Sequence, residues 1–543
     1  MAYEPESPFR SPIVGDLNLS PPTTVVREAI GLRDAAVPVE TGADPDRQVP
    51  MLIELNLRFP GGLQAVRDEF YALWEHYAGR SSGWWPVEVT SGSHVQPEVP
   101  QGLALVAPKL YQTVLSRGDL RSLVEDDRQA AARTGRPPTI FRVWPDYPLD
   151  PQIDRSAPTV KANAAWRAYD ARGSGIVWAV IDSGIDAAHP HFSRLELAAE
   201  GRGEDLPQGR TTRLHRDFSF LVNPDDPVAQ PPGGAPGQNA AFVDDCGHGT
   251  HVAGIIAGCT PDGMTPRVAT PDEPVDGGFV ARAGADRLSG MAPDCELVSI
   301  KVMRLSRQGT YVTSSSAVIR ALTYLRTEVN VDPAVLRVHG VNMSLGCVWE
   351  PKQYAAGQSP LCQAVGQVVA SGVVVVISAG NSGARTDSAD TSAIMGSITE
   401  PAHTEDCIAV GSTHREAPHA FGVTWTSGKG PTLDGRMKPD VVAPGEWIAS
   451  AASGKVRDSA GLKLVPGDPV PESLLTYAEL SGTSMAAPHV SGVIAAFLSA
   501  RPEFIGRPRE VKSLLTASAT DLGRERYAQG AGLVDLMRML ANV

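Results

Sequence analysis

The feature that most constrains the fold of this chain is a set of short apolar runs, rich in β-branched residues and separated by helix-length segments. The runs are Ile176–Ile181, Leu297–Val302, Val338–Met343 and Val373–Ile377. A strand that is apolar on both faces must be covered on both, and helix-length connections join strands that run parallel. The pattern therefore predicts an α/β fold in which helices flank both faces of a parallel sheet.

This grammar begins at about residue 157, and we assign residues 157–543 to one domain with inserted loops. Residues 51–150 form a smaller α+β unit. Its first strand is indicated by Ile53, Leu55 and Leu57, which alternate with polar residues, and helical spacing follows from Val66 to Tyr77. The order of its elements is predicted as β-α-β-α-β. Residues 1–50 are rich in proline and acidic residues and are interpreted as an irregular leader.

Composition and charge exclude several classes of function. The formal net charge of −13 disfavours binding to nucleic acid or to an anionic membrane surface, whose phosphates would repel the chain. No apolar stretch reaches the 18 residues of a membrane span. Six cysteines in 543 residues do not make a disulfide scaffold. Residues 1–8 lack the basic and apolar regions of a signal peptide, which predicts a cytoplasmic protein, with leaderless export as the alternative.

Chemically useful residues stand directly after three of the apolar runs. Asp182 follows the first, Ser344-Leu345-Gly346 follows the third, and Ala379-Gly380-Asn381 stands after the fourth. In an open parallel sheet, ligands bind beyond the carboxyl ends of the strands. We therefore expect these residues to meet at one edge of the sheet.

Two further segments are typical of helix openings, and each contains a side chain that can take part in catalysis. His248 lies in Gly247-His248-Gly249-Thr250, and Ser484 lies in Gly482-Thr483-Ser484-Met485. A serine hydroxyl needs a base to take its proton, a carboxylate can orient that base, and an amide can stabilise the oxyanion that forms. An acid, a base, a hydroxyl and an amide together predict nucleophilic acyl transfer.

From about residue 176 to the end, the chain resembles the subtilisin-like serine peptidases. The order Asp…His…Ser is that family's order, and the segments Gly290-Met291-Ala292-Pro293 and Lys438-Pro439-Asp440 agree with it. The resemblance implies a serine endopeptidase acting on proteins or peptides. The implied catalytic residues are Asp182, His248 and Ser484, with Asn381 in the oxyanion hole, and the implied substrate-binding residues are Ser344, Leu345, Gly346, Ala379 and Gly380.

Each of these residues also has a plainer interpretation. Asp182 and Asn381 could be turn formers, and the segment around Ser484 could be only a helix cap. His248 and His251 could be metal ligands, but the metallopeptidase pattern needs a spacing of four residues and an intervening glutamate. His251 and His489 are interpreted as packed helix histidines. The plain interpretations would all have to hold together, so we favour catalysis.

The resemblance implies no catalytic metal or other cofactor. Many relatives bind structural calcium, but the loop that would carry it is replaced here by the insertion 259–289. Weaker calcium candidates are Asp244, Asp245 and the pair Asp225-Asp226. The unit at 51–150 resembles the inhibitory propeptide domains of the family, with a recognition or assembly domain as the alternative. Two other functions remain open, a peptide ligase on the same fold and a permanently inhibited scaffold. Glu400 suggests tolerance for basic residues in the substrate.

Overall fold

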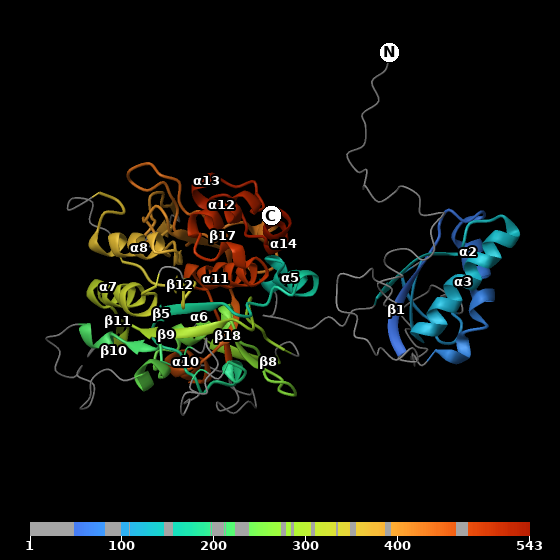
Figure 1. The fold of residues 1–543 in the computed structure, drawn as a ribbon, viewed down its shortest axis with the longest axis horizontal. Helices are drawn as coiled ribbons and strands as arrows, with labels where there is room; N and C mark the ends of the chain where they lie inside the picture. The colour runs from blue at the N-terminus through green and yellow to red at the C-terminus, as the bar shows by residue number, and fades with distance from the viewer. Residues whose placement is uncertain are drawn as a thin grey trace, which may run out of the picture. The chain divides into compact units, whose positions relative to one another are not determined.

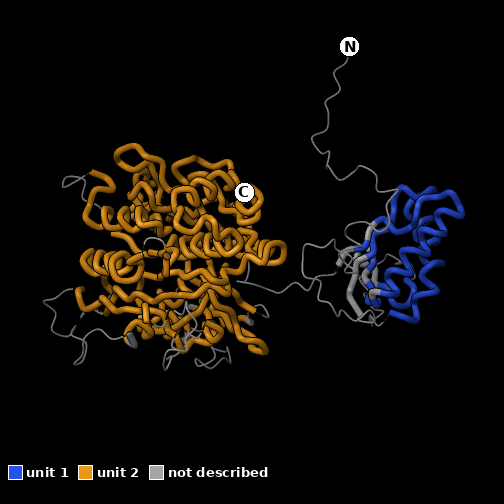
Figure 2. Tube along the Cα trace, in the orientation of Figure 1, with its two compact units in different colours: residues 1–149 blue, residues 150–543 orange. Residues whose placement is uncertain are grey.

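The computed structural model describes residues 48–81, 99–107, 109–145, 156–195, 197, 211, 213–222, 238–272, 278–283, 287–305, 310–332, 335–347, 355–385, 392–462 and 476–543. The chain divides into two compact units, residues 1–149 and residues 150–543 (Figure 2). Residues 1–47 of the predicted leader and most of the insertion at 223–238 lie outside the described residues.

The larger unit is built on a seven-stranded sheet in the order β17-β16-β13-β12-β5-β9-β6 (Figure 1). All of its strands pair in parallel. Their bounds are β5 (Val177–Asp182), β6 (Arg216–Asp217), β9 (Glu296–Lys301), β12 (Gly340–Met343), β13 (Val374–Ser378), β16 (Ile408–His414) and β17 (Val441–Glu446). The four apolar runs correspond to β5, β9, β12 and β13, while β6, β16 and β17 complete the sheet. The predicted parallel sheet is confirmed.

Strand β5 shows why this sheet must be covered on both faces, because all six of its residues are buried. Trp178 and Val180 belong to one core cluster, and Val177, Ala179 and Ile181 belong to a second one. Side chains alternate between the two faces of a strand, so each cluster lies on its own side of the sheet. An uninterrupted apolar run is the sequence signature of this arrangement.

Helices cover both faces. The first cluster includes residues of α5 (Ala162–Tyr169), α6 (His248–Ile256), α11 (Thr483–Ala500), α12 (Pro508–Ser518) and α14 (Leu536–Ala541). The second includes residues of α7 (Ser315–Tyr324) and α8 (Pro360–Ala370). Among the described helices, only α11 is long and apolar enough to cross a membrane, and 83% of that window is buried inside the structure. We therefore regard α11 as a core helix.

The insertion at 259–289 contains regular structure. It contributes β7 (Arg267–Asp272) and β8 (Gly278–Ala283) to a second sheet in the order β18-β19-β7-β8. The other two strands are β18 (Ile448–Ala451) and β19 (Tyr477–Leu480). Both belong to the stretch of chain that connects β17 to α11. Helix α10 (Gly454–Leu462) lies in the same part of the sequence. The remaining short elements are β10 (Arg304–Leu305), β11 (Tyr311–Val312), β14 (Ala384–Arg385), β15 (Ser392–Ala393), α4 (Ser156–Thr159), α9 (Pro418–Phe421) and α13 (Arg526–Gln529).

The smaller unit is a four-stranded antiparallel sheet with two helices. Its elements are β1 (Gln48–Leu55), α2 (Gly62–Trp74), β2 (Ala104–Ala107), β3 (Leu110–Ser116), α3 (Arg117–Thr134) and β4 (Ile140–Pro145). The strand order is β2-β3-β1-β4. The predicted order β-α-β-α-β was wrong by one strand, because the apolar run at 103–115 forms two paired strands. A single apolar run cannot show that its chain reverses.

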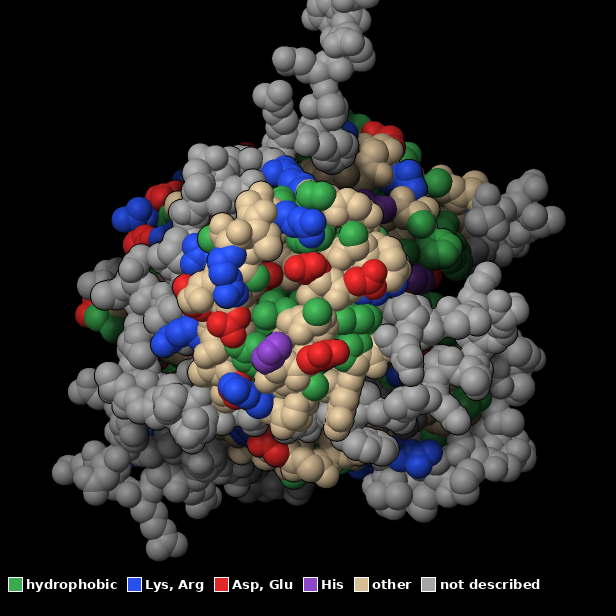
Figure 3. All heavy atoms as spheres, turned by 90° about the vertical axis from the view of Figure 1, so that its right-hand side faces the viewer, with side chains coloured by type: hydrophobic (Ala, Val, Ile, Leu, Met, Phe, Trp, Pro, Cys, Tyr) green, Lys and Arg blue, Asp and Glu red, His purple; other side chains and the backbone are tan. Residues whose placement is uncertain are grey.

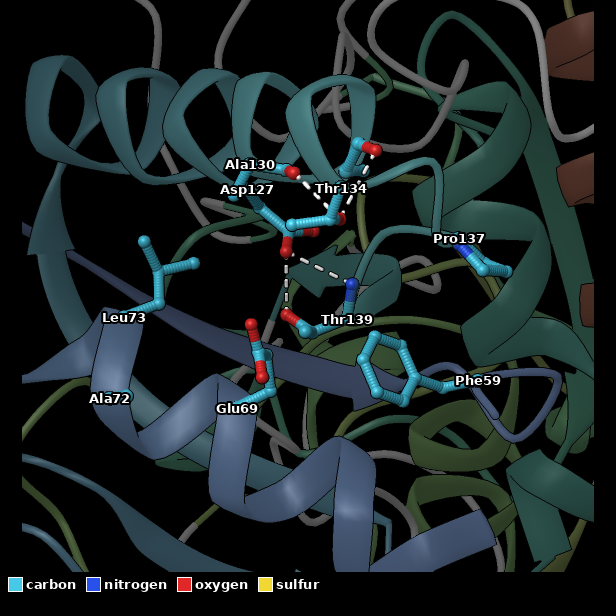
Figure 4. Close-up of a pocket in the computed structure, with 10 residues that line it drawn as sticks. Phe59, Glu69, Ala72, Leu73, Asp127, Ala130, Thr134, Pro137 and Thr139 are labelled. Carbon is cyan, nitrogen blue, oxygen red and sulfur yellow. Dashed lines mark hydrogen bonds between the residues drawn. The ribbon is translucent and has the colours of Figure 1, made fainter. Parts of the chain in front are cut away.

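The helices of the smaller unit pack on its core through Phe70, Trp74 and Leu120. On the side that faces the viewer in Figure 3, basic and acidic side chains are interspersed around a small hydrophobic area. A shallow pocket lies between α2 and α3, lined in part by Phe59 and Asp127 (Figure 4). The buried Asp127 carboxylate accepts hydrogen bonds from the backbone N–H and hydroxyl of Thr139, at 2.9 and 2.6 Å. It therefore anchors the start of β4.

Candidate active site

Polar side chains gather where three neighbouring strands end. Asp182 is the last residue of β5, Ser344 follows β12, and Asn381 stands three residues after β13. These strands are adjacent in the order β13-β12-β5, and Val341 pairs with Ala179 on one side and Val375 on the other. The expectation that these segments share one edge of the sheet therefore holds in the structure.

His248 is the first residue of α6, and the turn before it is tightly built. Gly247 has a φ of 88°, and a Cβ there would come within 2.0 Å of the Ser453 carbonyl oxygen. Only glycine fits this conformation and this space. Asp244 fixes the same turn, since its buried carboxylate accepts hydrogen bonds from the Gly247 and Thr250 backbone N–H groups, each at 2.8 Å.

The imidazole of His248 contacts the carboxylate of Asp182. The Nδ1 atom of His248 lies 2.8 Å from Oδ1 of Asp182, which also accepts the Ser183 backbone N–H at 2.7 Å. The Asp182 side chain is 0% exposed, whereas the His248 side chain is 23% exposed. The carboxylate is thus sealed, while the imidazole remains open to solvent on one side.

This pair changes the acid–base properties of the imidazole. Burial by itself lowers the pKa of His248, but the charge of Asp182 and the hydrogen bond to it outweigh burial, so that the pKa is raised above its ordinary value. A base held by a buried carboxylate in this way keeps one tautomer, with Nδ1 protonated and Nε2 available to accept a proton.

Ser484 lies in the first turn of α11, where backbone N–H groups have no partner within the helix. It is linked to the segment after β12 by two hydrogen bonds. The Ser484 hydroxyl donates to the Ser344 carbonyl oxygen at 3.2 Å, and the Ser344 hydroxyl donates to the Ser484 carbonyl oxygen at 2.8 Å. The nucleophile candidate and the substrate-binding candidate are therefore held against each other.

Asn381 is an exposed residue whose side chain turns toward the start of α11. Its Oδ1 accepts hydrogen bonds from the Thr483 backbone N–H at 2.9 Å and from the Thr483 hydroxyl at 3.0 Å. Since Thr483 N–H can only donate, the atom that faces it must be the amide oxygen. The amide NH₂ donates to none of the described residues and is left for a ligand.

Together these groups comprise a hydroxyl and an amide donor at the start of α11, and a base with an orienting carboxylate at the start of α6. The hydrogen bonds of the described residues do not include one between the Ser484 hydroxyl and His248, since that hydroxyl donates to Ser344. In enzymes without bound substrate, such bonds often form only when the substrate arrives. The arrangement has the chemistry of acyl transfer to a serine.

Comparison with known proteins assigns the chain to a family. Residues 173–533 match the sequence model of the Subtilase family, and this range contains all the site residues named above. The chain belongs to the subtilase family. Subtilases are serine peptidases, and the parallel α/β sheet is the fold that this membership implies.

Individual relatives agree with this assignment. Subtilisin DY of Bacillus licheniformis is 31% identical over 294 residues, which cover 54% of this chain and 77% of the relative. Serine protease AprX of Bacillus subtilis is 29% identical over 369 residues, 67% of this chain and 65% of the relative. Subtilisin E of the same organism is 28% identical over 364 residues, with the same two coverages. The match thus spans slightly less than two thirds of the latter two relatives.

The other histidines of this subtilase that the sequence analysis considered are packed in the interior. His251 Nε2 lies 3.0 Å from the Ala478 carbonyl oxygen, and His489 Nε2 lies 2.8 Å from the Ser156 hydroxyl. Burial is the main cause that lowers the pKa of His251 to about 3 and that of His489 to about 4. Both are therefore neutral, and their interpretation as packed helix histidines is confirmed.

Of the calcium candidates, Asp225 and Asp226 lie outside the described residues, and Asp244 has other partners. Asp244 is not an exposed acid, because both of its oxygens are taken up by donors from Ser183, Gly247 and Thr250. The described residues contain no group of three or more histidines, cysteines or acids that could hold a metal. Structural calcium remains a prediction without a located site. All six cysteines are free.

Sequence reasoning missed the roles of two residues that shape the site, one of which, Asp244, it named only as a calcium candidate. Asp244 holds the turn before His248, and Thr399 lies against the substrate-binding candidates Gly346 and Gly380. Asp244 precedes Gly247 by three residues, a spacing at which an aspartate side chain can hold a turn, and this signal could have pointed to it. Thr399 carries no motif, because its position depends on contacts with segments that lie about 20 and 50 residues away.

Proposed function

We propose that this subtilase is a serine endopeptidase that hydrolyses peptide bonds through an acyl-enzyme on Ser484. The observation that carries the proposal is the 2.8 Å contact between His248 Nδ1 and the fully buried Asp182 carboxylate. A buried carboxylate that orients a partly exposed imidazole, together with a serine in the first turn of a helix, is the combination that can activate a hydroxyl.

In the proposed mechanism each of these groups has one role. When a peptide binds, the Ser484 hydroxyl leaves the Ser344 carbonyl and attacks the scissile carbonyl, while His248 Nε2 takes its proton. Asp182 stabilises the imidazolium that results. The amide NH₂ of Asn381, whose oxygen is occupied by Thr483, donates to the oxyanion. His248 then protonates the leaving amine, and a water molecule deprotonated by the same imidazole releases the acid.

Substrate binding is assigned to the segments that follow β12 and β13. Ser344-Leu345-Gly346 runs beside the nucleophile, and Gly346 is exposed, so its backbone can pair with an extended peptide as an added strand. Ala379 and Gly380 form the opposite side next to Asn381. Strand addition reads mainly the peptide backbone and permits varied sequences.

The proposed function is tested by labelling with a fluorophosphonate and by hydrolysis of a peptide library. The wild type is expected to bind one equivalent of label and to yield products with carboxylic acid ends. Ser484→Ala is the matched control and should neither label nor cleave. A wild type that labels but joins peptides would be a ligase, and one that does not label would be an inhibited scaffold.

For the smaller unit we propose the role of an intramolecular inhibitor that is removed by self-processing. The support is its place before the peptidase unit and its compact α+β fold, which ends at β4. Wild type and Ser484→Ala should be expressed side by side and compared by intact mass. We expect cleavage within 149–159 in the wild type alone, and full-length chains in both would contradict the inhibitor role in favour of a recognition or assembly domain.

A further inference from the structure

The buried carboxylate of Asp244 is hydrogen-bonded to residues on both sides of the proposed catalytic pair. Its Oδ1 accepts hydrogen bonds from the Ser183 hydroxyl and the Gly247 backbone N–H, each at 2.8 Å. Ser183 directly follows Asp182, and Gly247 directly precedes His248. The side chain of Asp244 therefore joins the end of β5 to the start of α6, where the carboxylate and the imidazole of the pair meet.

The contacts of Ser183 and Thr250 extend this connection. The Ser183 hydroxyl accepts the backbone N–H of Gly249 at 2.9 Å, so the residues before and after His248 are both bound. Thr250 donates its backbone N–H and its hydroxyl to Oδ2 of Asp244, at 2.8 and 2.7 Å. The turn that carries His248 is thus fastened to one carboxylate, directly or through one hydroxyl.

The hydrogen bonds also indicate the charge of Asp244. Each of its oxygens accepts one hydroxyl and one backbone N–H, a group that can only donate. The ionised carboxylate uses all four donors, whereas a carboxylic acid proton would have to turn one hydroxyl away. Burial raises the pKa of Asp244 above its ordinary value, although these hydrogen bonds act in the opposite direction. We assign the ionised form at neutral pH, because only that form satisfies all four donors.

Little water reaches this charge. Asp244 is only 4% exposed. The start of α10 closes the turn from outside, because the Lys455 backbone N–H donates to the Asp245 carbonyl oxygen at 2.9 Å and the Val456 N–H donates to the Cys246 carbonyl oxygen at 3.1 Å. A charge in such a place is screened only weakly by water and salt. It therefore acts on the neighbouring imidazole across a short, dry path.

We propose that Asp244 is a positioning residue for His248 and also a second negative charge that favours the protonated imidazole. It touches neither the substrate nor the Ser484 hydroxyl in this assignment, and it acts through the turn and through its charge. The inference rests on the proposed function. It assigns to Asp244 a part of the acid–base control that would otherwise belong to Asp182 alone.

The electrostatics of the turn agree with this assignment in direction and in rank. Burial lowers the pKa of His248, the charge of Asp182 and the hydrogen bond to it raise this pKa, and the charge of Asp244 raises it further but by less. Burial is also the main cause that raises the pKa of Cys246 to about 11 and that of Tyr311 to about 12. Both of these groups are therefore neutral in the range where the imidazole titrates.

Several charged side chains stand on the elements around the turn, and none of them is among the four donors to Asp244. They are Asp182 and Asp186 after β5, Asp245 in the turn, Lys301 in β9, and Lys455, Arg457 and Asp458 in α10. Lys301 donates instead to the Val243 carbonyl oxygen at 2.7 Å. Asp245 is exposed, so water and salt screen its charge strongly. It provides a matched control, since it carries the same group one residue away.

The test follows the titration of His248 by nuclear magnetic resonance in the full-length chain with Ser484→Ala, which prevents self-digestion and makes the readout independent of activity. Asp244→Asn, Asp182→Asn and Asp245→Asn are compared in this background. We expect the midpoint of the imidazole titration to move to lower pH in Asp244→Asn, by less than in Asp182→Asn, and to stay unchanged in Asp245→Asn. An unmoved midpoint in folded Asp244→Asn, or an equal shift in Asp245→Asn, overturns the proposal.

With Ser484 restored, hydrolysis of a peptide substrate reports on the position of the imidazole. We expect kcat/KM to fall by up to about 10²-fold in Asp244→Asn, because the turn no longer holds the base in place. The acidic limb of its pH profile should move in the same direction as the titration midpoint. Ser183→Ala removes one hydrogen bond but keeps the charge, so it should lower kcat/KM without moving the limb. A limb that moves equally in both variants contradicts the role of the Asp244 charge.

Asp244→Asn places an NH₂ group against donors, so thermal unfolding is measured for each variant. If it does not fold, Asp244→Ser takes its place, because a serine hydroxyl still accepts the Gly247 N–H without the charge. The same shift of the midpoint is expected, and failure of both variants to fold would make Asp244 a structural residue and overturn the proposal. A wild type that does not cleave contradicts the proposed function, whereas a wild type that cleaves beside Asp244 variants with an unmoved midpoint contradicts this inference alone.

Discussion

Two carboxylates, one fully buried and one mostly buried, lie at opposite edges of the same parallel sheet and have very different partners. Asp182 ends β5 at the carboxyl edge, and Asp440 immediately precedes β17 at the amino edge. The Asp440 carboxylate accepts the Lys438 ammonium at 2.7 Å, the Lys512 ammonium at 2.9 Å and the Ala409 backbone N–H at 2.8 Å. Asp182 has only His248 and the Ser183 N–H, and its Oδ2 contacts no donor among the described residues.

The comparison shows how a carboxylate that takes part in catalysis can be distinguished from one that only stabilises the fold. Burial opposes ionisation of Asp440, but the charges of Lys438 and Lys512 outweigh it and hold its pKa below the ordinary range. Its partners are two ammonium groups, and neither exchanges a proton in the proposed reaction. Asp182 is instead paired with an imidazole, a group that gains and loses a proton near neutral pH. The incomplete and titratable pair is the one suited to catalysis.

The largest effect expected is on turnover after Asp182→Asn. The amide holds His248 in the wrong tautomer, so kcat should fall by about 10⁴-fold. Steady-state hydrolysis measured beside thermal unfolding checks this, with the midpoint of unfolding close to that of the wild type. A loss of kcat of less than tenfold would mean that neither carboxylate acts in catalysis, and it would refute the assignment of Asp182.

The same chemical change at the other edge should act on stability. Asp440→Asn leaves Lys438 buried without its counter-charge, and we expect the free energy of unfolding to fall by about 3–5 kcal/mol. Urea unfolding provides the measurement. The turnover per fluorophosphonate-labelled site should match the wild type, and a selective loss of kcat in the folded variant would contradict a structural role.

Removal of the Asn381 amide donor should lower turnover by less than Asp182→Asn does. We expect Asn381→Ala to lower kcat by about 10²–10³-fold with little change in KM, because the donor acts on charge that develops in the transition state. Asn381→Asp keeps the shape but replaces the NH₂ by an oxygen, so it should be at least as impaired. Full activity in either variant would exclude Asn381 from the oxyanion site.

The smallest effect concerns the dependence of activity on pH. His248 must be neutral to accept a proton, and its pKa is raised, so kcat/KM should fall tenfold per pH unit below an apparent pKa above the ordinary value of about 6.5. The ion pair also favours the protonated folded state, so its contribution to stability is present at low pH and is lost as pH rises through the pKa of His248. In Asp182→Asn the acidic limb should move to lower pH, and an unmoved limb would show that Asp182 does not set it.

The sequence predicted the part of the site that depends on local pattern. Asp182, Ser344 and Asn381 follow buried runs, and the parallel sheet brings such ends together. The pairing of Asp182 with His248 could be proposed from resemblance, but its geometry comes from the turn that Asp244 holds. The packing of Thr399 against Gly346 and Gly380 could not be predicted, since three separate segments meet there. Strand reversal at 103–115 was missed for a similar reason, because hydrophobicity does not report chain direction.

Helix α11 carries Ser484 in its first turn, and nearly all of its remaining length is buried in the larger core. During synthesis on a ribosome, Asp182 and His248 emerge long before this helix does. Until α11 docks, one face of the sheet lacks a large part of its helical cover, and the Ser484 hydroxyl that the proposed reaction needs is not in place. A nascent or prematurely terminated chain that lacks α11 would therefore be unable to hydrolyse other proteins. Docking of α11 both covers the sheet and supplies the proposed nucleophile.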